Sequence, residues 1–164
     1  MSTNRFIRNE QGLYLLPEPV AGEAIVEQAA EILFEDLRSR EALTKPTDAG
    51  QFLQLKLANE RHEHFTALFL DNRHRVLACE TLFTGTIDGA AVYPRVVAVR
   101  ALEHNAAAVI FGHNHPSGDP EPSDADRHIT RRLTEALGLL DVRVLDHLVV
   151  TRSGWISLAE RGWV

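Results

Sequence analysis

The apolar run from Ala106 to Phe111 is the feature of this 164-residue sequence that most constrains its fold. A continuous apolar run of this length, followed at once by a glycine and soon by prolines, is typical of a buried β-strand. A chain of this size forms a single domain with a substantial core. The strand must therefore lie inside that domain, among the elements that the flanking sequence forms.

The patterns around this run alternate between strand and helix. In chain order they predict strands over 64–71 and 75–83, a helix over 92–106 with Pro94 near its start, a strand over 107–113, a helix over 123–140, and strands over 142–150 and 155–160. The order β-β-α-β-α-β-β predicts an α/β fold in which helices pack on a mixed sheet.

Residues 1–44 are predicted to be a helical appendage to a main domain over 45–164. The segment 21–40 has apolar residues at helical spacing, which predicts an amphipathic helix. The stretch 44–50 then breaks the pattern with a proline and a glycine, as a boundary does. A second short helix is expected over 48–60.

The composition of the chain bears on the cellular compartment in which the protein works. Its apolar stretches are far shorter than the roughly 20 residues of a membrane span, and its first residues lack the apolar core of a signal peptide. The single cysteine, Cys79, excludes an internal disulfide and a cysteine-based zinc knuckle. We therefore expect a cytoplasmic protein without a membrane partner.

The charge of the chain bears on nucleic acid as a partner. A formal net charge of −6 at pH 7 argues against tight non-specific binding to DNA, which depends on clustered cations. Arg127, Arg131 and Arg132 do crowd one segment. The simpler interpretation of these three arginines is a solvated helix face.

A candidate metal site follows the central apolar run. On a strand, residues i and i+2 point to the same face, about 6.5 Å apart, so His113 and His115 can converge on one ion. Ser123 occupies the predicted N-cap of the next helix, and Asp126 lies three residues further, in its first turn. The strand end and the helix start can thus present two imidazoles and one carboxylate to a common point.

Two histidines, one carboxylate and a fourth position left to water compose a catalytic zinc site, although such ligands also permit other divalent metals. The structural alternative is that Ser123 and Asp126 form a capping box and the histidines are polar residues at a strand end. The histidine pair and the Ser123–Asp126 pair occur together and in this order, which favours metal binding.

Other histidines in the sequence are alternatives to this site. His62 and His64 have the same i, i+2 relation but no carboxylate downstream at helical register. His147 follows Asp146 in a predicted strand, where it is either a partner of a metal ligand or a satisfied core histidine.

The residues His113-x-His115-Pro116, followed by Ser123-x-x-Asp126, resemble the JAMM (MPN+) metalloprotease motif. The longer words "LFTGTIDGAAVYPR", "GHNHPSGDPEPSDAD", "RVLDHLVV" and "LAERGW" resemble the RadC family, which carries that motif. The likeness runs from about Lys45 to the C-terminus. It implies a JAMM/MPN fold, an α/β sandwich related to cytidine deaminases, with one zinc ion held by His113, His115 and Asp126.

The resemblance also implies a serine beside the reacting water, here Ser123, and a glutamate from an early strand as general base. Glu63 opens the first strand of the main domain and is the favoured candidate; Glu80, on the neighbouring strand, is the alternative. The implied activity is zinc-dependent hydrolysis of a peptide or isopeptide amide bond in a protein or peptide substrate.

Other interpretations stay open. Longer members of the family carry an N-terminal helix-hairpin-helix that binds DNA, for which the first 44 residues leave no room. The alternative function is a non-catalytic DNA-repair or mobile-element accessory protein that binds nucleic acid or a protein partner. A deaminase-like enzyme would need a cysteine pair that Cys79 alone cannot supply. The C-terminal stretch 155–164 could pair between chains in a homodimer.

Overall fold

The structure, a computed structural model, describes residues 6–85 and 91–164. Its elements are β1 (Ile7–Arg8), β2 (Tyr14–Leu15), α1 (Gly22–Ser39), α2 (Pro46–Leu57), β3 (His64–Leu70), β4 (Val76–Thr84), α3 (Pro94–Glu103), β5 (Ala108–Asn114), α4 (Asp124–Gly138), β6 (Arg143–Thr151) and β7 (Gly154–Ser157). The sequence also predicts a glycine-punctuated loop over residues 84–90, and most of this loop lies outside the described ranges. Within those ranges, no helix has the length and apolar character of a membrane span.

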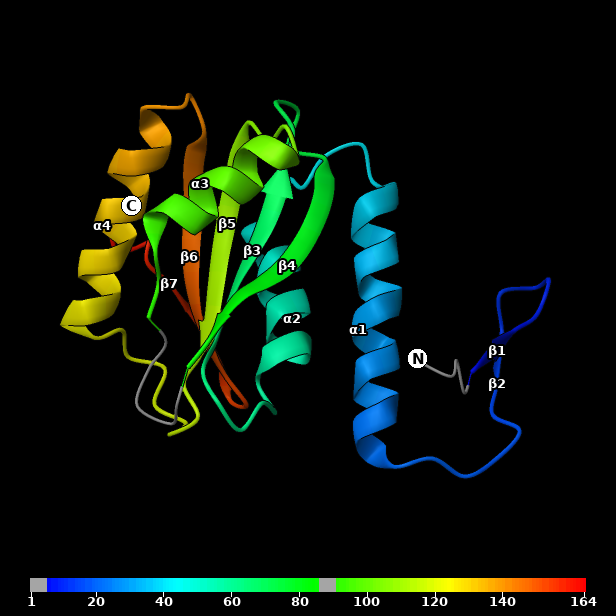
Figure 1. The fold of residues 1–164 in the computed structure, drawn as a ribbon. Helices are drawn as coiled ribbons and strands as arrows, with labels where there is room; N and C mark the ends of the chain where they lie inside the picture. Colours follow the sequence, from blue (N-terminus) through cyan, green and yellow to red (C-terminus); the bar gives the residue numbers. More distant parts are fainter. Residues whose placement is uncertain (1–5, 86–90) are drawn as a thin grey trace.

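Five strands form one mixed sheet in the order β4-β3-β5-β6-β7 (Figure 1). The pair β5–β6 is parallel, and the other three pairs are antiparallel. The run that we predicted to be a buried strand is β5, the central strand of the sheet, and it is buried along its whole length. The predicted α/β fold with a mixed sheet and flanking helices is confirmed.

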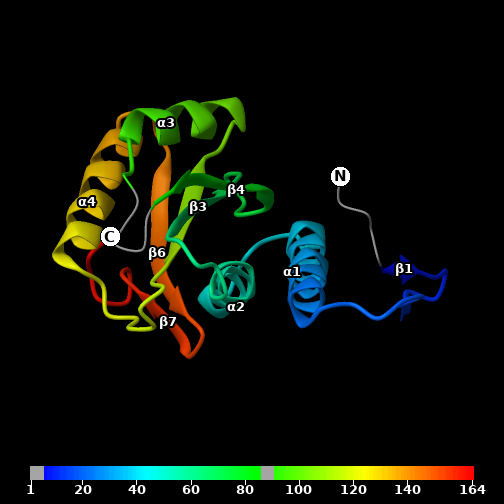
Figure 2. The same cartoon turned by 60° about the horizontal axis from the view of Figure 1, so that its bottom comes forward.

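Helices cover the sheet on both sides (Figure 2). On one side α2 packs on the sheet through Phe52, Leu53 and Leu57, with α1 beyond it. On the other side α3 and α4 pack on an aromatic layer that includes Phe65 and Phe111. The molecule is therefore a three-layer sandwich with a separate apolar core on each face of the sheet.

Alternation along β5 sends its side chains to these two cores in turn. Ile110 belongs to the core under α2, whereas Val109 and Phe111 belong to the core under α3 and α4. Because successive side chains on a strand point to opposite faces, His113 continues the series on the α4 side. Asn114 continues the series on the α2 side.

The N-terminal region contains the predicted helix α1 and, before it, a hairpin of two very short strands that the sequence did not predict. Ile7 and Leu15 of the hairpin are exposed, and Figure 1 shows the hairpin apart from the main body, beyond α1. Leu37 of α1 and Leu43 after it are buried in the core under α2. The domain boundary after residue 44 stays a prediction.

Most predicted elements differ from those in the structure by one to three residues at their ends, and two of these differences have a clear structural cause. Helix α2 begins two residues earlier than expected, because Pro46 occupies its first turn, where a missing N–H has no effect on helical hydrogen bonds. The last strand ends at Ser157, not at residue 160. The chain leaves the sheet there because the Ala159 amide and the Ser157 hydroxyl both donate to Asp146, at 3.0 Å and 2.7 Å.

Gly50 in α2 allows the indole ring of Trp155 to lie directly on the helix backbone. A Cβ at this position would stand 2.6 Å from Nε1 of Trp155, well inside contact distance. We expect Gly50→Ala to lower the free energy of unfolding by about 1–2 kcal/mol, because overpacking outweighs the better helix propensity of alanine. Gly138→Ala in α4 is the control, since a Cβ there meets nothing within 4 Å. Urea denaturation of both variants measures the effect, and a Gly50→Ala protein as stable as Gly138→Ala would contradict it.

Candidate metal centre

The carboxyl end of β5 supplies two histidines to one point. His113 lies in the strand with its side chain on the α4 side and 1% exposed. His115 is the first residue after the strand, and its amide donates to the Val150 carbonyl of β6 at 3.1 Å. The parallel pairing with β6 thus holds the chain extended through His115, so both imidazoles reach the same side.

The start of α4 supplies the carboxylate. Ser123 is the N-cap, its hydroxyl oxygen accepts the Asp126 amide at 3.1 Å, and the Asp126 carboxylate accepts the Ser123 amide at 2.7 Å. These two bonds form a capping box. The structural interpretation of this segment is therefore correct, and it does not exclude the metal interpretation, because the cap itself turns Asp126 toward the histidines.

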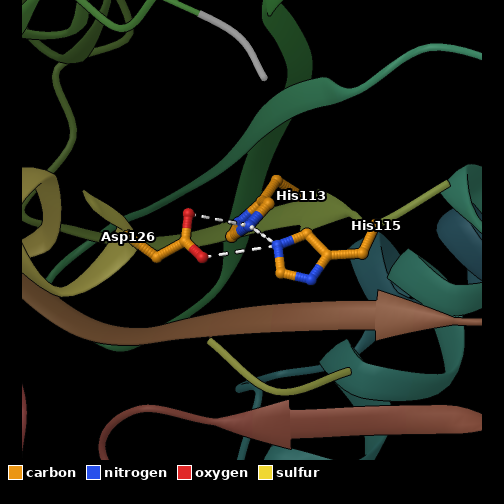
Figure 3. Close-up of side chains that lie close together, drawn as sticks. All are labelled: His113, His115 and Asp126. Atoms are coloured by element: carbon orange, nitrogen blue, oxygen red, sulfur yellow. Dashed lines mark hydrogen bonds and ion pairs between the residues drawn. The ribbon is translucent and has the colours of Figure 1, made fainter. Parts of the chain in front are cut away.

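The three side chains converge (Figure 3). Nε2 of His113 lies 2.9 Å from Nε2 of His115 and 3.2 Å from Oδ1 of Asp126, and Nε2 of His115 lies 3.3 Å from Oδ2 of Asp126. Ligands held about 2.0 Å from a tetrahedral ion are about 3.3 Å from one another. The separations in the cluster are close to this value, so the three side chains could hold a metal ion.

The ring of His115 is oriented for ligation by its other nitrogen. Nδ1 of His115 lies 2.8 Å from the Asp119 carbonyl oxygen. A carbonyl only accepts hydrogen bonds, so Nδ1 carries a proton, and Nε2 is the nitrogen of this ring that can ligate an ion. Nε2 faces Asp126 and His113.

The charges of the cluster interact strongly. Burial opposes ionisation of Asp126, but the adjacent His113 and His115 hold the pKa of its carboxyl well below the usual range. The hydrogen bond with Asp126 raises the pKa of His115, and the charge of Glu63 contributes in the same direction. Asp126 is therefore a carboxylate under ordinary conditions, as a metal ligand must be.

Glu63 lies directly before β3, and its charge acts on His115. Its backbone position is fixed from both sides by Asn114, which is 1% exposed. Nδ2 of the Asn114 side chain donates to the His62 carbonyl at 2.9 Å, and its Oδ1 accepts a hydrogen bond from the His64 backbone N–H at 2.8 Å. Asn114, the residue between His113 and His115, thus holds the segment that carries Glu63.

Glu80 is engaged elsewhere. It lies on β4 and accepts hydrogen bonds from Arg100 at 2.8 Å, while His104 lies 2.5 Å from its other oxygen. The hydrogen bond from Arg100 is the main reason that the pKa of Glu80 falls to about 2. A carboxylate with so low a pKa, held by a guanidinium, is a poor proton acceptor near neutral pH.

Ser123 is exposed, and its hydroxyl takes part in the cap. Besides accepting the Asp126 amide, Oγ donates to Oδ2 of Asp126 at 2.8 Å. The serine predicted to act in catalysis therefore borders the cluster, with its proton directed at the Asp126 carboxylate.

The remaining candidates lie outside the cluster. His62 is exposed, and Nδ1 of His64 lies 3.5 Å from a Glu60 carboxylate oxygen. Over residues 6–85 and 91–164, His113, His115 and Asp126 form the only group of three or more such side chains able to hold an ion. The three arginines predicted to form a solvated face are exposed on α4, and Arg127 lies over the Trp163 ring at 4.8 Å.

His147, which the sequence left open, contacts the cluster. It is fully buried, and its Nε2 lies 2.8 Å from Nδ1 of His113. Its own Nδ1 lies 2.5 Å from the hydroxyl of Thr130 in α4. The sequence reasoning missed Thr130 and Asn114. The available signals were that Thr130 follows Asp126 by one helical turn and that Asn114 is a polar residue within a buried strand.

Comparisons with known proteins give a family match and several similar proteins. A family model described as RadC-like JAB domain matches residues 43–163. A protein of Vibrio cholerae named UPF0758 protein is 53% identical over 151 residues, which cover 92% of this chain and 95% of the relative.

Longer relatives also match. A UPF0758 protein of Xanthomonas campestris is 56% identical over 141 residues, which cover 86% of this chain and 63% of the relative. One of Marinobacter nauticus is 59% identical over 140 residues, which cover 85% of this chain and 62% of the relative. The chain thus spans somewhat under two thirds of the length of these two proteins.

Proposed function

We propose that this chain, which belongs to the RadC-like JAB domain family, is a zinc-dependent hydrolase that cleaves a peptide or isopeptide amide bond in a protein or peptide substrate. The convergence of His113, His115 and Asp126 at separations suited to one ion carries the proposal. Two imidazoles and one carboxylate leave a fourth position for water, as in hydrolytic zinc sites.

A zinc ion held by these three residues would polarise a bound water and lower its pKa toward neutrality. Glu63 would accept a proton from the attacking water and deliver it to the leaving amine nitrogen, as a general base and then a general acid. The products are a carboxylic acid and an amine. The charge of Glu63 acts on His115, whereas Glu80 is held by Arg100, and both observations favour Glu63 for this role.

Ser123 would stabilise the oxyanion that forms on the scissile carbonyl. Its exposed hydroxyl lies beside the cluster and now donates to Asp126. Rotation about one side-chain bond redirects that proton, so the role requires the hydroxyl to exchange a carboxylate acceptor for the developing oxyanion.

Metal removal tests the proposal. Purified protein should contain one zinc ion per chain by elemental analysis, and it should hydrolyse at least one member of a peptide and isopeptide library. Treatment with a chelator should abolish hydrolysis, and Zn²⁺ should restore it. Full hydrolysis by metal-free protein, or none by zinc-loaded protein across such a library, would contradict the proposed function.

A further inference from the structure

A chain of hydrogen bonds leads from one candidate ligand to another through the interior. It begins at the Asp126 backbone carbonyl, which accepts the Thr130 hydroxyl at 2.6 Å. It continues from Thr130 to Nδ1 of His147 at 2.5 Å and from Nε2 of His147 to Nδ1 of His113 at 2.8 Å. We call Thr130 and His147 the relay.

The direction of each bond follows from the carbonyl at its start. The Asp126 carbonyl can only accept, so it takes the one proton of the Thr130 hydroxyl. The hydroxyl oxygen must then accept from His147, whose Nδ1 therefore carries a proton. A neutral His147 has no proton left for Nε2, which accepts from Nδ1 of His113.

The surroundings of His147 hold it in the neutral form. Its ring is fully buried and packs edge-on against the rings of Phe65 and Phe111, at centroid distances of 5.4 Å and 6.0 Å. Thr130 and His113 are the polar side chains that its nitrogens contact. The Asp126 charge acts on this ring only from a distance, and the Asp146 carboxylate accepts the backbone amide of His147 and not a ring N–H. An imidazolium there would be a buried cation whose ring nitrogens contact no anion, which is unfavourable.

We propose that the relay positions His113 as a metal ligand by fixing its tautomer. With Nδ1 protonated and bound to His147, Nε2 of His113 keeps a lone pair, and this nitrogen faces Asp126 and His115. The inference rests on the proposed metal centre and adds to it a histidine acceptor and a threonine that set the state of one ligand. Thr130 and His147 are positioning residues, because they act through His113.

A purely structural role for these residues predicts a different result. If His147 only filled the core, changing its hydrogen bonds without changing its shape would alter stability and leave metal affinity as it is. If the relay fixes the tautomer, the affinity must change, because a His113 protonated on Nε2 has to shift that proton before it can bind an ion.

Matched threonine variants separate these cases. Thr130→Val removes the relay hydroxyl and keeps the shape of the side chain. Thr134→Val is the control, because the Thr134 hydroxyl makes the same kind of bond, to the Thr130 carbonyl at 2.9 Å, one turn further along α4. His147→Leu removes the acceptor for His113, whereas His147→Gln offers a side-chain oxygen in its place.

The readout is the affinity for Zn²⁺ alone, measured by competition with a chromophoric chelator. We expect Thr130→Val and His147→Leu to bind Zn²⁺ about 10–100-fold more weakly than wild type, the usual effect of losing a partner of a ligating histidine. Thr134→Val should keep wild-type affinity, and His147→Gln should recover most of it. Wild-type affinity in both Thr130→Val and His147→Leu would overturn the relay.

Imidazole ¹⁵N chemical shifts of metal-free wild-type protein test the inference without any variant. The spectra are recorded at alkaline pH, where the ring is neutral, and His113 should then be protonated on Nδ1 and not on Nε2; the opposite tautomer would overturn the inference even if His147→Leu fails to fold. Failure of wild-type protein to bind Zn²⁺ would instead contradict the proposed metal centre, and the ¹⁵N shifts would still decide whether the relay sets the tautomer.

Discussion

Replacing Asp126 with asparagine is expected to weaken zinc binding by more than the roughly 10–100-fold that the loss of an outer partner causes. The change removes the one anionic ligand of the cluster and replaces a carboxylate oxygen with a neutral amide. The fold should persist, because the asparagine oxygen can still accept the Ser123 amide that the carboxylate accepts at 2.7 Å. Zinc content and affinity, measured beside a thermal melt, test both halves of this expectation.

Asp126→Ala is the matched comparison for that experiment. It removes the ligand and the acceptor of the capping box together, so it should lose zinc and also about 1 kcal/mol of stability. The difference in melting between the two variants isolates the contribution of the cap. An Asp126→Asn protein that holds one zinc ion with wild-type affinity would exclude Asp126 from the ligand set.

Glu63→Gln is expected to lower kcat by about 10²–10⁴-fold and to leave zinc content unchanged, because it removes the proton acceptor and no ligand. The segment that carries Glu63 should keep its position, since the contacts that hold it involve its backbone atoms. The Glu63 carbonyl accepts the Gly85 amide at 2.8 Å, and Asn114 binds the residues on either side. The measurement is hydrolysis of a substrate identified with zinc-loaded wild-type protein.

Glu80→Gln is the control for the general base. It breaks the ion pair with Arg100 and should lower stability, while kcat stays at the wild-type value. Full activity in Glu63→Gln together with loss of activity in Glu80→Gln would reverse the assignment. The two glutamates are adequate controls for each other, because Glu63 directly precedes β3 and Glu80 lies on β4, the strand that pairs with β3.

The order of elements and the candidate ligands could be predicted from sequence because both depend on local patterns. Apolar alternation and helical spacing are properties of short segments, so the succession from β3 to β7 followed from them. His113 and His115 follow a buried strand, and Asp126 follows a helix cap, so their convergence required only that this strand and this helix be neighbours.

The relations that sequence reasoning missed or left open join residues far apart in the chain. Nothing local indicates that Arg100 and His104 hold Glu80, because the contact depends on how α3 lies over β4. The partner of His147 is His113, 34 positions away, and the two meet because β5 and β6 pair in parallel. Strand pairing determines such contacts, and the spacing of apolar residues along the sequence does not indicate which strands pair.

The structural and the metal interpretation of the segment from Ser123 to Asp126 are compatible with each other. One carboxylate accepts the N-cap amide and also faces two imidazoles. A capping box at the start of α4 is therefore no evidence against Asp126 as a metal ligand. It is a means of holding the ligand before any ion binds.

That shared carboxylate also limits where the chain can change in length. An insertion between Ser123 and Asp126 would break the cap and displace the candidate ligand in one step. An insertion between His115 and Asp119 would move the carbonyl that orients the His115 ring at 2.8 Å. Because tolerance of insertions follows backbone hydrogen bonding, we expect length variation among homologous sequences in this segment to be confined to residues 120–122.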